Sequence, residues 1–351
     1  MALPNIYLDH AATTPMMPCA RDAWLEGAAI WANPSSPHAA GRGARAALED
    51  ARARVKAALD WQGEVIFTSG ASEALALGLG RAKAERRLVS AVEHDAVFRA
   101  APDAQVIPVR EGEVDREALA AALAGAGRAV VAVQSVNSET GTALLSYADN
   151  PLVQQVRESG GLFLADCSQS AGKSALPDAD MVVLSAHKLG GPIGIGALLV
   201  RDFAMIEPSG GQERGYRAGT ENLPGALGFA AALEACGVES WATSAEQRFD
   251  FRNRLSEHGE VIQPGVQCSH IFAVAAPKMS ATAMLIRMDA KGFAISAGSA
   301  CSSGTLKQSR VLQGFGIDPD TAKRTVRISL GWSTTPDELD AFAQAWAEVN
   351  A

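Results

Sequence analysis

One lysine stands out among the residues that could do covalent chemistry. Lys188 follows the apolar run 180–185 and precedes the stretch 190–196, which holds four glycines. An amine enclosed in such a site is disfavoured as an ammonium ion, because desolvation penalises the charge, and it can then react with a carbonyl group. A lone lysine in a glycine-rich loop is more often a solvated surface residue. The residues around Lys188 therefore decide between the two interpretations.

Two more segments place reactive groups directly after predicted strands. Asp166 ends the apolar run 161–166, where an acidic group can pair with a cationic ring nitrogen or can serve as a turn or cap residue. The segment 68–74 (TSGASEA) opens directly into a predicted helix. Its free N–H groups and the helix dipole can bind a phosphate, although an ordinary N-cap by Ser69 or Ser72 is the simpler interpretation.

A histidine and a polar turn lie at two further strand ends. His94 comes just after the short run 87–92, and the polar segment 137–139 follows the run 128–136. A single histidine is usually a satisfied or exposed residue, but one at a strand end can serve as a base or as a stacking partner. Ligands bind at the carboxyl ends of strands in open α/β sheets, so His94 becomes a site candidate.

The cysteines are judged one by one. The chain has five of them, an odd number without any CxxC spacing, which indicates neither a disulfide framework nor a zinc site, and we expect no bound metal. Cys301 lies among Ser, Gly and Ala residues in the segment 296–304, a composition typical of an exposed loop, and is the best candidate nucleophile. The remaining four are interpreted as structural or incidental: Cys19, Cys167, Cys236 and Cys268.

The elements that must position these residues alternate between helix and strand. From about residue 43 onward, helical and strand-like patterns follow one another, which predicts a mostly parallel sheet with both faces covered. One of the predicted helices covers 72–85. The last quarter mixes apolar runs with helices in the manner of a smaller α+β domain. We expect a large domain over 16–245 and a small domain made of 1–15 and 246–351.

Bulk composition narrows the class of protein. Of the 351 residues, 48% are hydrophobic and 20% are charged, as in an ordinary globular protein. The net charge is −8 and the arginines form no stripe with aromatic residues, so nucleic acid is not expected as a partner. The N-terminus shows neither a basic segment nor an apolar leader, and no run approaches the roughly 20 residues that span a membrane. We expect a cytoplasmic protein without a membrane partner.

Taken together, these segments resemble the cysteine desulfurases, a branch of the class V aminotransferases that depend on pyridoxal phosphate (PLP). The resemblance covers nearly the whole chain in the order of the family, and it implies the PLP-dependent transferase fold type I, with a mostly parallel seven-stranded sheet flanked by helices and a smaller α+β domain. The matching stretches are 7–15, 33–42, 68–74, 93–97, 165–173, 185–196, 210–222, 296–304 and 326–331.

The resemblance also implies a role for each matching residue. Lys188 would hold PLP as a Schiff base, Asp166 would pair with the pyridinium nitrogen, and Gln169 would hydrogen-bond the phenolic oxygen of the ring. His94 would stack on the ring and move protons. The phosphate would be held by Ala71, Ser72, Ser185 and His187, together with Thr220, which would reach the phosphate of the neighbouring subunit of a homodimer.

The implied reaction converts L-cysteine to L-alanine. Arg327, with Asn33, would bind the substrate carboxylate through a bidentate guanidinium contact. Lys188 would take up the Cα proton, and Cys301 as a thiolate would attack the substrate sulfur and keep it as a persulfide. The sulfur would then pass to an acceptor protein, such as an iron–sulfur scaffold, or serve other thiolation reactions.

This chain departs from the family pattern at a few positions. Ser138 replaces the second Asn of a usual NNE segment and would weaken a cofactor contact or bridge it by water. Leu164 stands where His is common, and 307–312 reads KQSRVL instead of a typical EPSHVL. The chain also stops soon after the predicted helix over 336–350, so delivery to the iron–sulfur scaffold is less secure than desulfuration itself.

Two rival functions remain at this point. A selenocysteine lyase or a small-amino-acid aminotransferase would share the cofactor, but transamination has no need of the Cys301 thiol. A non-catalytic binding subunit would explain the change at Ser138, yet it would not require Lys188, Asp166 and Cys301 together. The sequence leaves open the acceptor, the pathway and the preference for sulfur or selenium.

Overall fold

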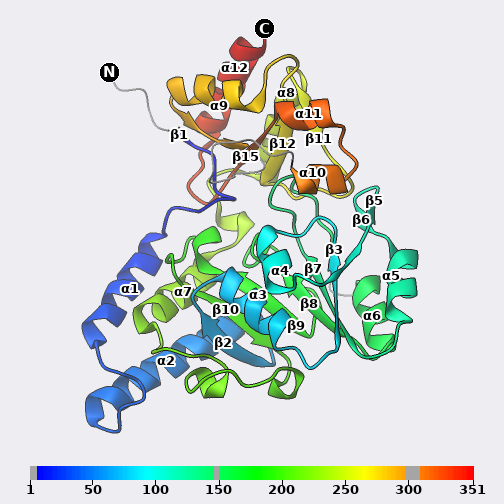
Figure 1. Cartoon of the computed structure of the whole chain (residues 1–351). Coiled ribbons are helices and arrows are strands. Elements are labelled where there is room, and N and C mark those ends of the chain that lie inside the picture. The colour runs from blue at the N-terminus through cyan, green and yellow to red at the C-terminus, as the bar shows by residue number, and fades with distance from the viewer. Residues whose placement is uncertain (1–5, 146–149, 298–308) are drawn as a thin grey trace.

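The computed structural model describes residues 6–145, 150–297 and 309–351. Its main layer is a seven-stranded sheet of order β2-β10-β9-β8-β7-β3-β4 (Figure 1). The five strands from β9 to β4 are parallel, whereas β10 runs antiparallel to both of its neighbours. The prediction of a mostly parallel seven-stranded sheet is confirmed. The strands are β2 (Glu64–Thr68), β3 (Arg86–Ser90), β4 (Gln105–Ile107), β7 (Ala129–Gln134), β8 (Leu162–Asp166), β9 (Met181–Ser185) and β10 (Gly196–Val200).

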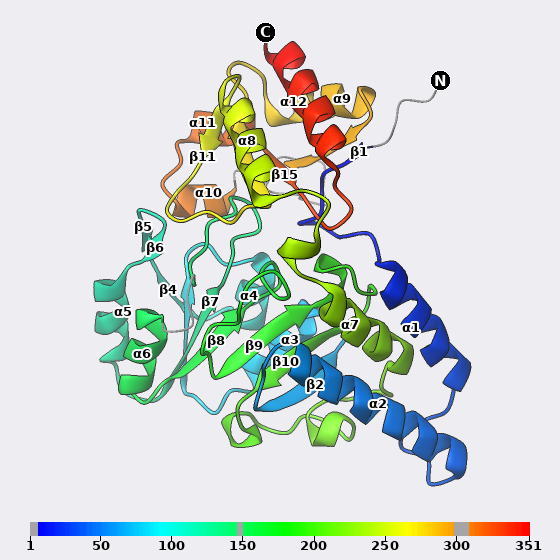
Figure 2. The same cartoon turned by 180° about the vertical axis from the view of Figure 1, so that it is seen from behind.

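Helices cover both faces of this sheet. Figure 1 shows α3 (Ala71–Gly80) and α4 (Asp95–Ala100) in front of the strands. The view from behind shows α2 and α7 against the opposite face (Figure 2), and α1 packs on α7. The helices that belong to this second layer are α1 (Pro18–Ile30), α2 (Ala39–Ala58), α5 (Arg116–Leu123), α6 (Pro151–Glu158) and α7 (Leu223–Ala235).

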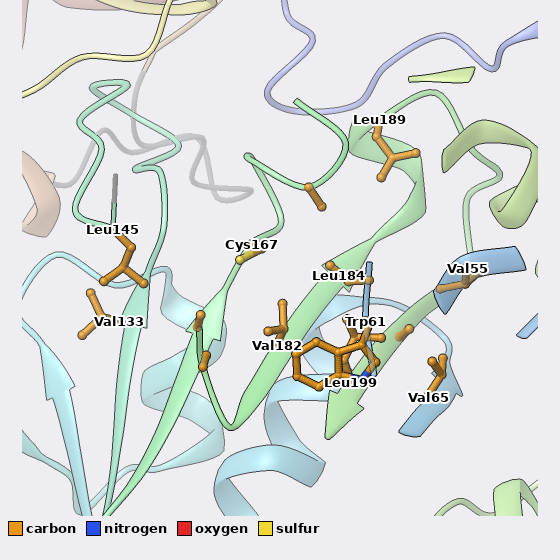
Figure 3. Packing of buried hydrophobic residues seen from close by; sticks show 14 of the residues in the cluster. Val55, Trp61, Val65, Val133, Leu145, Cys167, Val182, Leu184, Leu189 and Leu199 are labelled. Carbon is orange, nitrogen blue, oxygen red and sulfur yellow. The ribbon is translucent and has the colours of Figure 1, made fainter. Parts of the chain in front are cut away.

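The arrangement of one sheet between two layers of helices follows from the strands, in which side chains alternate between the two faces. Successive residues of β8 point to opposite faces, so Phe163 joins the core under α2 and α7 while Leu164 joins the core under α3. The strands are buried on both faces, which is why they read as continuous apolar runs. Figure 3 shows Val182, Leu184 and Trp61 packed in the first of these cores. Each buried side chain of this size contributes roughly 1.5–3 kcal/mol.

The C-terminal part forms a second, smaller sheet above the first (Figure 1). Its order is β11-β12-β15-β14, and every neighbouring pair is antiparallel. Three helices bury one face of this sheet with aromatic and Met side chains, among them Phe251, Met284, Phe342 and Trp346. The elements are α8 (Ala245–Ser256), β11 (Glu260–Ile262), β12 (Ile271–Ala275), α9 (Ala281–Ala290), β14 (Ser296–Ala297), α10 (Arg310–Gly314), α11 (Pro319–Arg324), β15 (Thr325–Ser329) and α12 (Pro336–Asn350).

Two short pairs complete the secondary structure. Near the N-terminus β1 (Ile6–Tyr7) runs parallel to β13 (Phe293–Ala294), so the first described residues lie beside the C-terminal part. The hairpin of β5 (Val109–Arg110) and β6 (Glu113–Val114) projects from the large sheet. No helix among the described residues is long and apolar enough to cross a membrane. The domain boundaries predicted at 15/16 and 245/246 stay a prediction.

One predicted helix was too long. The helix expected over 72–85 is α3, which ends at Gly80. Beyond it the chain leaves the helix because Ala82 forms a bridge with Ile206 and Glu85 donates its N–H to the carbonyl of Arg128. Pairing with neighbouring segments thus outweighs the helical propensity of the residues after Gly80.

A buried ion pair ties α2 to the loop that precedes α7. Arg52 of α2 donates to Glu213 at 2.8 Å, and their side chains are only 5% and 1% exposed. Glu213 also accepts the backbone N–H of Phe67 in β2 at 2.9 Å. Arg52 donates further to the carbonyl of Val65 at 2.5 Å. The pair therefore fixes the 210–222 loop against β2, the strand that leads into α3.

We predict that Glu213→Gln destabilises the fold by about 3–5 kcal/mol, because it removes the buried one of the two carboxylates that pair with Arg52 and leaves only the half-exposed Glu49. Urea unfolding followed by fluorescence measures the change. The matched control is Glu234→Gln, which removes an ion pair with Arg54 whose side chains are 43% and 32% exposed. That control should cost less than about 1 kcal/mol. Equal effects of the two substitutions would contradict the role given to the buried pair.

Candidate functional site

Lys188 lies in a tight turn at the carboxyl end of β9. The turn is the 3₁₀ segment Ala186–Lys188, and Gly190 follows it with a φ of +93°. A Cβ atom on Gly190 would lie 2.8 Å from the side chain of Met17. This position therefore requires glycine both for its backbone conformation and for the close approach of the N-terminal segment.

The surroundings of Lys188 favour the neutral amine. Burial lowers its pKa, the carboxylate of Asp166 opposes that change, and the guanidinium of Arg327 adds to it. Among the described residues, no carboxylate forms an ion pair with the Lys188 amine. The interpretation of Lys188 as a reactive lysine thus has a physical cause in its position, since a neutral amine is the form that attacks a carbonyl.

Asp166 and Gln169 lie beside this lysine because β8 and β9 are parallel neighbours that end at one edge. Asp166 is 7% exposed, and its Oδ1 accepts the N–H and the hydroxyl of Ser168 at 2.9 and 2.5 Å. Gln169 donates from Nε2 to the carbonyl of Ala11 at 2.8 Å. Its Oε1 is buried without a hydrogen-bond partner, so one polar atom of the site is left for a ligand.

A row of residues across three strands forms a second part of the site. Ser185 of β9 lies opposite Gly196 of β10, which in turn lies opposite Thr68 of β2. A Cβ atom on Gly196 would lie 2.8 Å from the Cα of Gly70, so the turn before α3 packs directly on this row. Ser185 is thereby brought to the N-terminus of α3.

The N-terminus of α3 has unused backbone donors. The helix starts at Ala71 after Gly70, which supplies no side-chain cap, and the N–H groups of Ala71 and Ser72 have no acceptor among the described residues. Free N–H groups at a helix N-terminus, with the dipole behind them, favour an anion. The ordinary N-cap by Ser69 or Ser72 is wrong, since no side chain caps the helix.

His94 lies at the end of β3 and caps α4. Its Nδ1 accepts the N–H of Ala96 at 3.1 Å, which leaves Nε2 free to face a ligand. Although the ring is exposed, the surrounding protein lowers its pKa, first through desolvation and then through the positive charge of Lys188. A histidine that stays neutral near physiological pH can accept a proton.

Directly before it, Glu93 is fully buried. One carboxyl oxygen accepts the hydroxyl of Ser90 at 2.5 Å and the N–H of Gln134 at 2.9 Å, and the other has no partner. Burial raises the pKa of Glu93 to about 8, against the lowering effect of these hydrogen bonds. The acid is therefore a neutral hydrogen-bonding group at neutral pH.

Arg327 reaches the site from β15 of the smaller sheet. Its Nη2 lies 2.7 Å from Oδ1 of Asp9, and its Nη1 donates to the carbonyl of Ser138 at 3.0 Å. The residue is 6% exposed, and its Nε is buried without a partner. Ser138, the departure from the family pattern, thus contacts Arg327 through its backbone rather than its side chain.

Two of the predicted site residues, Asn33 and Thr220, do not lie with the residues around Lys188 in a single copy of the chain. Asn33 lies in the loop between α1 and α2, where its Oδ1 accepts the N–H of Ser35 at 2.8 Å. Figures 1 and 2 show that α1 and α2 meet at the end of the molecule away from the smaller sheet. Thr220 is exposed on the 210–222 loop. The substrate contact of Asn33 and the phosphate contact of Thr220 stay predictions.

Cys301, the predicted nucleophile, lies outside the described residues. The described residues nearest to it in sequence contact the site on two sides. Ser296 pairs with Arg327 in the β14–β15 ladder and donates to Asp9 at 2.8 Å. Ser309 donates to Glu139 at 2.6 Å. The described residues on both sides of the Cys301 segment therefore lie beside the site.

The other cysteines show no sign of reactivity. Burial raises the pKa of Cys167 to about 12 and that of Cys236 to about 11, and it also raises the pKa of Cys268. These thiols stay protonated, which makes them poor nucleophiles. Cys19 is exposed and free. Over residues 6–145, 150–297 and 309–351, no group of His, Cys, Asp and Glu side chains could hold a metal ion.

The stretch 9–17, which overlaps the matching motif 7–15, has no expected role from the sequence. In the structure, this stretch runs along the site: the carbonyl of Ala11 accepts from Gln169, and the hydroxyl of Thr13 lies 3.1 Å from Nδ1 of His187. Desolvation and the charge of Lys188 lower the pKa of His187 to about 4, so this ring is neutral. The available signal was the polar residues Asp9, His10, Thr13 and Thr14 between small alanines.

A second cavity, larger than the crevice at Lys188, lies away from the sheet edge that carries the candidate site. It does not bring together the reactive groups described above. It measures about 820 Å³ and is lined by the end of α2, the loop 172–178 and the end of α7. Lys173 lines it and also lines a narrow crevice that contains Lys188. The edge of the sheet at Lys188 remains the better candidate site, because the orphaned polar atoms and the free helix amides gather there.

Comparisons with known proteins cover almost the entire chain. Residues 6–342 match the family described as aminotransferase class-V. A cysteine desulfurase from Frankia sp. is 35% identical, over 98% of this chain and 91% of that protein. One from Bradyrhizobium diazoefficiens is 33% identical, over 98% and 94%. The solved structure of a NifS-like protein from Rickettsia africae superposes with a TM-score of 0.85 at 26% identity, covering 98% of this chain and 99% of that one.

We predict that Glu93→Gln flattens the pH dependence of stability. Folded Glu93 keeps its proton up to about pH 8, whereas a glutamate with the ordinary pKa of 4.5 loses it far earlier, so the stabilising contribution is complete below pH 4.5 and is lost as pH rises toward 8. The slope amounts to at most about 1.4 kcal/mol per pH unit. Urea unfolding at pH 5, 6.5 and 8 measures it. An unchanged slope in the variant would show that Glu93 is ionised in the folded protein.

Proposed function

The chain belongs to the aminotransferase class-V family, and from that premise we propose that it is a PLP-dependent cysteine desulfurase, which converts L-cysteine to L-alanine and carries the sulfur as a persulfide on Cys301. One observation carries the proposal. A half-buried lysine, a buried carboxylate and a free helix N-terminus meet at one sheet edge in a chain whose relatives are named cysteine desulfurase. A fully solvated surface lysine would stay an ammonium ion and would react poorly with the aldehyde of PLP.

The residues at this edge fit PLP. Lys188 offers an amine for the aldehyde, and Asp166 offers a carboxylate for the ring nitrogen. The unused N–H groups of Ala71 and Ser72 suit the phosphate. The buried Oε1 of Gln169 has no hydrogen-bond partner in the chain and supports the proposal, because it could accept a bond from a donor of the bound group. Ser185 and His187 would add to the phosphate contacts, and His94 would lie against the ring.

Bound PLP would supply a ring that accepts electrons from the substrate Cα. The residues of the chain would do the rest. Lys188, whose pKa is lowered by burial, would receive the Cα proton, and the neutral His94 would assist in moving it. The Nε of Arg327 has no partner and would contact the substrate carboxylate while the rest of the guanidinium stays fixed to Asp9 and Ser138.

Cys301 would accept the sulfur. As a thiolate it attacks the sulfur of the substrate, an S–S bond forms, and the bond between Cβ and sulfur breaks. Overall one sulfur atom is inserted into the S–H bond of Cys301, and the carbon skeleton leaves as alanine, so no external oxidant or reductant is consumed. The segments on either side of Cys301 support this role, since Ser296 and Ser309 both contact the site.

A homodimer fits the surface of the chain. Large apolar side chains are exposed on α1, at its end and in the loop after Lys188: Leu25 is 54% exposed, Trp31 is 88% exposed and Ile193 is 77% exposed. A second copy covering them would bury apolar area that is costly in water. We further propose a cytoplasmic location and an acceptor protein for the sulfur, such as an iron–sulfur scaffold.

The purified protein, supplied with PLP and L-cysteine, should produce alanine and sulfide in equal amounts when a thiol reductant is present. Lys188→Ala should lower both by at least about 100-fold, because it removes the group that holds the cofactor and moves the proton. Amino-acid analysis and a sulfide assay measure the products. A colourless protein that gains no visible absorption from added PLP would instead support a non-catalytic binding subunit.

Replacing the thiol separates desulfuration from related reactions. Cys301→Ala should reduce sulfide production by at least about 100-fold and should leave the visible absorption of bound PLP in place, since the thiol acts on sulfur and not on the cofactor. An aminotransferase would lose nothing from this change. Sulfide release by the variant at the rate of the unchanged protein would reject the assignment of Cys301, and a comparison of L-cysteine with L-selenocysteine tests the remaining alternative.

A further inference from the structure

Arg310 connects the smaller sheet to the turn that carries His94. It is the first residue of α10, and Ser309 caps that helix by accepting the N–H of Leu312 at 3.1 Å. The position belongs to the segment 307–312, where this chain departs from the family pattern and has arginine in place of histidine. Its contacts are therefore a property of this chain.

The guanidinium of Arg310 contacts the chain on both sides of His94. Nη1 donates to the carbonyl of Ala91 at 3.2 Å, and Nη2 donates to the carbonyl of Glu93 at 2.8 Å and to Oδ1 of Asp95 at 2.8 Å. Among the described residues, no other group donates to the carbonyls of Ala91 and Glu93. Arg310 thus closes a clamp around the three residues 93–95.

Packing holds the clamp in place. The Arg310 guanidinium lies 3.7 Å from the centre of the Phe98 ring in α4, a distance at which the cation and the ring attract each other. A Cβ atom on Gly314 would lie 2.9 Å from a methyl carbon of Val92, so α10 sits directly on the turn. Val311 is buried in the core of the large sheet. The planar fork of arginine, with several donors, suits two carbonyls and one carboxylate at once.

We propose that Arg310 is a positioning residue for His94. It holds the carbonyls of Ala91 and Glu93 before the histidine and the carboxylate of Asp95 after it, and so fixes the direction in which the ring points. The ring is fixed further because Nδ1 of His94 accepts the N–H of Ala96. The proposal rests on the proposed function for the part that concerns catalysis. The positioning of the ring is a separate statement that needs neither cofactor nor substrate.

The first test uses the PLP-loaded protein. Arg310→Met should lower kcat about 10-fold and change KM less than about 3-fold, because a displaced His94 affects proton transfer more than binding. It should also alter the visible circular dichroism of bound PLP. Arg310→Lys keeps the charge but not the fork, so it should recover part of both signals. Unchanged kcat and circular dichroism in Arg310→Met would overturn the proposal.

The matched control is Arg324→Met. Arg324 lies on α11 and donates to the carbonyls of Ala276 and Pro277, which belong to the smaller sheet and its loop. The substitution Arg324→Met therefore removes the same kind of arginine-to-carbonyl contacts and leaves the turn of His94 unchanged. Thermal unfolding of all variants separates loss of fold from loss of position. Equal effects of Arg324→Met and Arg310→Met on kcat would show a merely structural role.

A second measurement tests the positioning role of Arg310 separately from the proposed desulfurase function. Nitrogen NMR of histidine-labelled protein without PLP reports whether Nδ1 of His94 accepts a hydrogen bond, with His94→Asn used to assign the signal. Arg310→Met should shift this signal, and Arg324→Met should leave it in place. If the unchanged protein lacks desulfurase activity but the shift occurs, the proposed function fails while the positioning role stands. An unshifted signal overturns the positioning role whatever the activity.

Discussion

The structure depends on one buried constraint, the ion pair between Asp9 and Arg327. The two residues are 318 positions apart, and the guanidinium is 7% exposed. A charge buried to this degree is costly unless it is paired, so the pair ties the N-terminal stretch 9–17 to β15. The same stretch then reaches Gln169 and His187 at the ends of the large sheet. It therefore joins the two sheets where a substrate must lie.

The strands and their polar ends were predictable because both leave marks in adjacent residues. The runs that became β8 and β9 are apolar throughout, as strands buried on both faces must be, and Asp166 and Lys188 follow them at once. Parallel neighbours end at one edge, so the meeting of these two side chains follows from the alternation of helix and strand. The antiparallel direction of β10 left no such mark, because a fully buried strand reads the same in either direction.

The remainder of the site depends on contacts between distant parts of the chain. No local pattern shows that the carbonyl of Ala11 meets Gln169, or that the carbonyl of Ser138 meets Arg327. The carbonyl of Ser138 accepts from Arg327, a contact to which residue type is indifferent, and the weakened or water-bridged contact of its side chain with the cofactor stays a prediction. The end of α3 at Gly80 has the same origin, since pairing with residues near 206 replaces the last helical turns.

The position of the first strand also bears on how the protein is made. Leu8 accepts the N–H of Ser329, and Ala11 donates to the Ser329 hydroxyl at 2.9 Å, so the earliest described residues to leave a ribosome pair with some of the last. During synthesis the large sheet can form and bind residues 11–17 while residues 6–9 still lack their partners in β13 and β15. The nascent chain must keep residues 6–9 unpaired until β13 and β15 emerge, and only then can the site be assembled. Truncated translation products are consequently unable to hold Arg327 against Asp9.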